Sequence, residues 1–135
     1  MAEAIAERAF LLNLPDIVRT IINRAAHTPC VIYLAAAFAV VPDHSNAVHV
    51  RIRAPYRWRV SNYQREHLVD RRRAEKTIRS DDRRQHASVR ALWHLDADDE
   101  SHYTVVLDAS RVPDDRLVRI LLNAAAINDH VSELR

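Results

Sequence analysis

The chain has 135 residues, 48% apolar and 28% charged, which is typical of one soluble globular domain. It contains no glycine, and this excludes every glycine-rich nucleotide-binding fingerprint within these residues. A single cysteine excludes an intrachain disulfide, and the N-terminal residues show neither a signal-peptide pattern nor a membrane-length apolar run, so we expect a cytoplasmic protein without membrane partners.

The net charge is only +2, but the charges are unevenly distributed. Residues 51–90 carry thirteen Lys or Arg against five acids, a net charge of +8, whereas residues 91–135 carry four against nine, a net charge of −5. Arginine dominates the basic block, and its planar guanidinium binds phosphate oxygens in a bidentate manner. The block fits two interpretations equally well, an anion-binding surface or a solvated helix face.

Apolar periodicity and turn residues predict alternating helices and strands. In the first part of the chain they predict helices over 2–12 and 15–27, a buried strand over 30–34 with Cys30 in the core, a helical turn over 35–41 and a loop at 42–46. Further on they predict a strand over 48–53, helices over 56–68 and 71–93, a strand over 103–108 and a helix from Asp114. The pair Ser80-Asp81 could interrupt the longest helix. Because glycine is missing, any residue with positive φ is expected to be Asn, Asp or His.

Strands separated by helices predict an α/β fold with a small, mostly parallel sheet of about three strands and flanking helices. We expect a single domain over 1–135. Its predicted parts are N-terminal helices at 1–28, a strand-helix-strand-helix core at 29–70, an arginine-rich helical segment with an acidic loop at 71–100, and the last strand and helix at 101–135.

Several short motifs occur in a recognisable order. They are the run from His49 to Pro55 with Arg59 following, Asp81 with Arg84 and Arg90, and the run from Tyr103 to Asp108 leading to Ser110-Arg111. Their order and spacing resemble the cytidylate kinase-like family of P-loop nucleotide kinases, across roughly residues 17–125. The resemblance implies a truncated version of that family's layer architecture.

In that family, a mobile helical lid follows the Ala-Pro strand, and its arginines clasp the phosphates of donor and acceptor. The resemblance therefore implies that Arg84 and Arg90 are lid arginines, that Arg59 lies near a phosphate, and that Asp81 orients the arginines through hydrogen bonds. The alternative is that Arg84 and Arg90 are exposed residues paired with acids such as Asp81 or Asp82 at helical spacing.

Two departures from the family argue against catalysis. No glycine-rich loop is present to hold donor phosphates, and Leu34-Ala35-Ala36 stands where the family usually has Gly-Arg-Gly. We therefore expect a degenerate relative with no catalytic residues and no cofactor, which retains nucleotide or phosphate binding or serves assembly or regulation. ATP and Mg²⁺ would apply only to the alternative, a kinase half activated by a separately supplied phosphate-loop segment.

Three further features of the sequence concern nucleic acid, metal ions and assembly. Arginines interleaved with Tyr56, Trp58 and Tyr63 suit an RNA- or DNA-binding protein, which is the second hypothesis. Eight histidines lack His-x-x-x-His spacing, so no metal site is expected. The kinase architecture implies a central strand between those at 30–34 and 48–53; without it, strand edges would be left unpaired, and we expect a homodimer to cover them.

Overall fold

The computed structural model describes residues 15–24, 27–41 and 47–133, and their contacts separate into two compact units. Unit 1 consists of Met1–Pro42 and Gln85–Asp98, and unit 2 consists of Asp43–Arg84 and Asp99–Arg135. The predicted helix over 2–12 and the predicted loop at 42–46 lie outside the described residues. That the whole chain folds as one domain stays a prediction.

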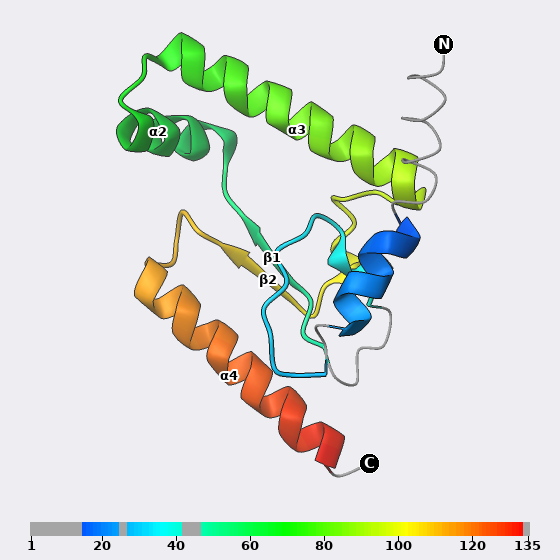
Figure 1. The fold of residues 1–135 in the computed structure, drawn as a ribbon. Helices are drawn as coiled ribbons and strands as arrows, with labels where there is room; N and C mark the ends of the chain where they lie inside the picture. Colours follow the sequence, from blue (N-terminus) through cyan, green and yellow to red (C-terminus); the bar gives the residue numbers. More distant parts are fainter. Residues whose placement is uncertain (1–14, 25–26, 42–46, 134–135) are drawn as a thin grey trace, which may run out of the picture. The chain divides into compact units, whose positions relative to one another are not determined.

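Unit 2 contains a parallel pair of strands, β1 (Val50–Arg53) and β2 (Val105–Asp108), drawn side by side in Figure 1. The register pairs the first residues, Val50 and Val105, and the last, Arg53 and Asp108. Before the pair, the His49 N–H donates to Thr104 Oγ1 at 3.1 Å, and the Thr104 N–H donates to the His49 carbonyl at 2.7 Å. The predicted α/β class with a parallel sheet is confirmed, and both strands lie within the predicted ranges.

Two helices follow β1 in unit 2. The first is α2 (Tyr56–His67), and Pro55 directly before it has a fixed φ that is compatible with a helix start. The second is α3 (Arg71–Trp93), and the Asp70 side chain before it accepts a hydrogen bond from the Arg73 N–H in the first turn at 2.8 Å. The helix α3 runs without the interruption that Ser80-Asp81 suggested, and it continues from unit 2 into unit 1.

The helices α2 and α3 pack through a small apolar cluster. Val60, Ala74 and Ile78 are buried, and Ala74 has no exposed surface. Tyr56, Tyr63 and Val69 pack against these three and are partly buried. The alanine allows close approach because a larger side chain would not fit at that position.

After β2, the chain passes through Pro113 into α4 (Asp114–Glu133), the last helix of unit 2 (Figure 1). Asp114 and Asp115 lie in its first turn, where carboxylates interact favourably with the helix dipole. A short 3₁₀ helix, η2 (Glu100–His102), precedes β2. In the part of the chain that the structure describes, no helix is both long and apolar enough to cross a membrane.

Unit 1 is built from residues 15–24, the 3₁₀ turn η1 (Ala37–Ala39) and the end of α3 with the loop that follows it. The helix predicted over 15–27 is confirmed for residues 15–24, and the helical turn predicted over 35–41 is confirmed by η1. The buried side chains of this unit are Ile22, Ala36, Phe38, Val40, Val89 and Ala97.

The predicted buried strand over 30–34 is wrong. These residues form neither strand nor helix, Val31 and Tyr33 are fully exposed at 98% and 104%, and Cys30 is exposed rather than buried. A strand requires a neighbour for its N–H and C=O groups, and the described residues place no strand beside this segment, while β1 pairs with β2. The sheet therefore has two strands in the described residues, not about three.

The prediction about positive φ is only partly correct. Among the described residues, φ is positive at Ala36 (58°), Leu68 (53°) and His94 (56°). Histidine is one of the expected types, but alanine and leucine are not, because a Cβ atom disfavours this conformation. Leu68 adopts it as the C-cap of α2, where helices commonly end in the left-handed conformation.

Candidate functional site

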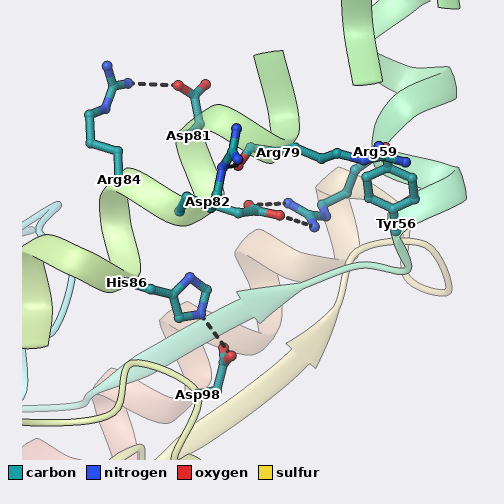
Figure 2. A network of polar contacts seen from close by, with 9 residues as sticks. Tyr56, Arg59, Arg79, Asp81, Asp82, Arg84, His86 and Asp98 are labelled. Atoms are coloured by element: carbon teal, nitrogen blue, oxygen red, sulfur yellow. Dashed lines mark hydrogen bonds and ion pairs between the residues drawn. The ribbon is translucent and has the colours of Figure 1, made fainter. Parts of the chain in front are cut away.

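The predicted site residue Arg59 lies on α2 and binds Asp82 of α3. Its two terminal nitrogens donate to the two carboxylate oxygens at 2.7 and 2.8 Å, and Figure 2 shows this paired geometry. Each side chain is 36% exposed, so water reaches the pair only in part. The apolar packing between α2 and α3 brings these two residues together across a sequence separation of 23.

A second contact joins the same two helices. The Arg79 Nε donates to the Tyr56 hydroxyl at 3.0 Å, and the Arg79 guanidinium carbon lies 5.5 Å from the centre of the Tyr56 ring. Tyr56 also packs against the apolar cluster beneath. This contact and the Arg59–Asp82 pair together fix the relative position of α2 and the first half of α3.

The predicted site residues Asp81 and Arg84 contact each other. Arg84 donates to Asp81 at 2.7 Å across one helical turn, and Figure 2 shows that this carboxylate and the carboxylate of Asp82 bind different arginines. The Arg84 side chain is 76% exposed and that of Asp81 52%, and such exposed pairs contribute a few tenths of a kcal/mol to stability. The contact agrees with both interpretations of these residues, orientation of a lid arginine and a solvated helix pair.

The fourth predicted site residue, Arg90, lies on the part of α3 that belongs to unit 1. It is exposed, and no hydrogen bond or ion pair joins its side chain to another described residue. In the same unit, His86 Nε2 and Asp98 Oδ2 are 2.8 Å apart (Figure 2), and the Asp98 N–H donates to Asp96. These contacts connect α3 to the acidic loop that follows it. Of the predicted residues, the structure thus brings Asp81 to Arg84 but gives Arg59 a different acid.

A polar turn lies at the carboxyl end of β2. The Ser110 hydroxyl and N–H both donate to Asp108 Oδ1, at 2.6 and 2.9 Å, and Arg111 Nε is 3.7 Å from Asp108 Oδ2. The hydrogen bond from the Ser110 hydroxyl, followed by that from its N–H, lowers the pKa of Asp108 from its ordinary value of 3.8. Asp108 is therefore ionised at neutral pH and stabilises this turn.

The turn lines one side of a hollow of about 360 Å³ in unit 2. Trp58 of α2 lines it together with residues 109–114. Open α/β sheets bind ligands beyond the carboxyl ends of their parallel strands. Trp58 comes after the carboxyl end of β1 in the sequence, and Ser110 comes after that of β2. Trp58 is 38% exposed, and the side chain of Arg111 is 83% exposed. The hollow therefore brings together an aromatic surface, a hydroxyl, the carboxylate of Asp114 and the cation of Arg111, which also lies beside Asp108.

Several arginines of the proposed nucleic-acid surface have protein partners. Arg53 binds Glu100, and the Arg51 guanidinium lies 5.8 Å from the centre of the Tyr103 ring. Arg71 of the same basic block binds Glu75 at 2.8 Å through its Nε alone, so its terminal nitrogens stay available. Fewer of these arginines are available to phosphate than the sequence suggests.

Sequence reasoning missed the role of Asp82 and the hollow beside Trp58. Helical spacing pairs Asp82 with an arginine of its own helix, whereas the arginine that binds it comes from α2. The position of Ser110 and Arg111, directly after a predicted strand, was the available signal for the hollow. In the described residues, no three His, Cys, Asp or Glu side chains gather as metal ligands.

The two parallel strands and the arginine-bearing helices that follow β1 define a small α/β chain. A sequence model of the cytidylate kinase-like family matches residues 3–111, and the chain belongs to this family. No curated protein matches the chain significantly, and no solved structure does.

Proposed function

We propose that this member of the cytidylate kinase-like family binds nucleotide in the hollow beside Trp58 and does not transfer phosphate by itself. The observation that carries the proposal is the grouping of Trp58, Ser110 and Arg111 at the carboxyl end of the parallel strands. The indole ring suits stacking with a base, and Arg111 suits contact with a phosphate.

The expected lack of transfer follows from the sequence. None of the 135 residues is glycine, so these residues contain no loop whose backbone N–H groups could surround the donor phosphates. Arg59, the expected phosphate neighbour, and Arg84, one of the two expected lid arginines, are instead paired with acids. Phosphoryl transfer depends on positioning and charge neutralisation of phosphates, and these residues alone do not provide both. A role in assembly or regulation is compatible with such binding.

Fluorescence tests the binding half of this proposal. In a Trp93→Phe background, ADP is expected to change the emission of Trp58 saturably, and Arg111→Gln should weaken binding about tenfold because it removes a charged hydrogen bond. Arg119→Gln, which removes an exposed arginine of α4 that does not line the hollow, is the matched control and should leave binding unchanged. Absence of a saturable change, or equal losses in both variants, would contradict a nucleotide site there.

A second experiment tests the lid arginines and catalysis. If Arg84 and Arg90 contact nucleotide, ATP should raise the melting temperature and the double Arg→Ala variant should lose that rise. An unchanged rise would favour the solvated-face interpretation.

Formation of CDP from ATP and CMP at roughly 1–100 per second would refute the lack of transfer. Transfer that appears only with an added phosphate-loop polypeptide would favour the kinase-half alternative. Steeply salt-dependent RNA binding would favour the second hypothesis.

A further inference from the structure

Unit 2 contains a second hollow, with a volume of about 380 Å³, that shares no lining residue with the first. Five of its lining residues come from α2 and one, Arg71, begins α3. On α2 they form two adjacent rows at helical spacing, Tyr56, Val60 and Gln64 in one and Arg57 and Ser61 in the other. Its volume is in the range of small-molecule sites.

The lining of this second hollow is cationic. Arg57 and Arg71 contribute two positive charges from two different helices, and the lining includes no carboxylate. Two guanidinium groups that line one hollow attract an anion that both can contact, even though Glu75 already pairs with one of them. The hollow therefore favours an anion.

Several N–H and O–H donors of the side chains that line this hollow are not used in contacts among the described residues. Among the described residues, no hydrogen bond or ion pair engages the side chains of Arg57, Ser61 or Gln64. Arg71 uses its Nε to bind Glu75 at 2.8 Å, and its terminal nitrogens have no protein acceptor within the part of the chain that the structure describes. The bond to Glu75 also raises the pKa of Arg71 and lowers that of Glu75, so both remain charged. Glu75 thus holds one arginine in place and leaves its fork available.

We infer that this hollow binds the phosphate group of a small phosphorylated molecule between Arg57 and Arg71, separately from the nucleotide site. The two guanidinium groups supply several N–H donors, and Ser61 and Gln64 supply a hydroxyl and an amide. Tyr56 and Val60 provide an apolar wall for the organic part of the ligand. A phosphate ester is favoured over free phosphate because the volume exceeds that of the anion alone.

NMR titration of the ¹⁵N-labelled full chain tests this site with two probes, inorganic phosphate and phenyl phosphate. We expect saturable shifts of the amides of Arg57, Ser61 and Gln64, with tighter binding of phenyl phosphate because of the apolar wall. Equal affinity for the two probes would still support the anion site and would assign it to free phosphate. Shifts spread over the arginines of α3 without saturation would overturn the inference.

Arg→Gln substitutions inside and outside the hollow separate binding at this site from a general effect of positive charge. Arg57→Gln and Arg71→Gln should each weaken phenyl phosphate binding about tenfold. Arg72→Gln removes the same charge from an adjacent exposed residue that does not line the hollow, and should change affinity less than twofold. Equal losses in all three variants would show a non-specific effect of charge and overturn the inference. Arg111→Gln, which tests the first hollow, should have no effect here, so the two sites can fail independently.

Discussion

Leu68 has an unfavourable left-handed backbone conformation, and its side chain is not buried against the protein. Its φ is 53° at the end of α2, and the side chain is 91% exposed. We expect Leu68→Gly to raise the free energy of unfolding by about 0.5–1 kcal/mol, because glycine removes a left-handed penalty that exceeds its own entropy cost. Chemical denaturation measures this gain. Leu68→Ala keeps the Cβ atom and should give no gain; equal stabilisation by both variants would mean that loss of an exposed apolar group is the cause.

Asp108 makes the stability of unit 2 sensitive to acid. Its folded pKa lies below the ordinary value of 3.8, chiefly because the Ser110 hydroxyl donates to it. The stabilisation is therefore complete well above pH 3.8 and is lost as the pH falls below that value and through the lower folded pKa. In Ser110→Ala, NMR titration of the carboxyl carbon should show the pKa of Asp108 rising toward 3.8, and the loss of stability in acid should be smaller.

Asp99 provides a matched control for this titration. Its pKa is lowered in the same way, by hydrogen bonds from the side chain and N–H of Ser101. Ser101→Ala should raise the pKa of Asp99 and leave that of Asp108 unchanged. A pKa of Asp108 that does not respond to Ser110→Ala would show that the hydroxyl is not the main cause of the shift.

At the level of elements, the contact between α2 and α3 depends on a small side chain. Ala74 has no exposed surface and is surrounded by Val60, Ile78 and their neighbours. Ala74→Leu should lower the free energy of unfolding by about 1–3 kcal/mol, because extra methylene groups in a packed core force strain. Ala87→Leu makes the same change at an exposed position of α3 and should stay within about 0.5 kcal/mol. Thermal and chemical denaturation compare the two; equal effects would mean that the α2–α3 contact is loosely packed.

Local patterns were enough to predict most elements of this fold. Alternation closed by Ala54-Pro55 indicated β1, the segment that follows indicated α2, and the run from Tyr103 to Asp108 indicated β2. The segment 30–34 has an equally strong apolar pattern, yet it forms no strand because strand formation depends on a partner elsewhere in the chain. The same limit applies to the site, since Asp81 and Arg84 are close in sequence and were predicted, whereas the partner of Arg59 comes from a distant turn of α3.

At the scale of the whole molecule, both units expose large apolar side chains. In unit 2 these include Ile52 on β1 at 54%, Val118 at 55% and Leu122 at 65%, the last two separated by one turn of α4. In unit 1 they include Val31 and Tyr33, which are fully exposed. Isolated exposed apolar residues are common, but Val118 and Leu122 share one face of α4, as residues of an interaction surface on a helix do.

The sheet gives a second reason to expect association. The pair β1 and β2 has two outer edges, and the described residues place no further strand on either of them. Unpaired N–H and C=O groups on such edges readily pair with another chain, and a second copy is the simplest partner. We therefore expect a homodimer, with an interface above about 1,000 Å² as specific contacts require.

Light scattering coupled to size-exclusion chromatography across a dilution series tests this expectation. The measured mass should be twice 15.5 kDa at high concentration and should fall toward the monomer as the sample is diluted. Leu122→Asp and Val118→Asp should promote dissociation if α4 takes part, because a buried charge without a partner is unfavourable. Arg119→Asp, on the same helix, changes an exposed charged residue and is the control. If the wild-type chain has a monomeric mass at every concentration and melts cooperatively, the exposed edges are stable without a second copy and the homodimer is wrong.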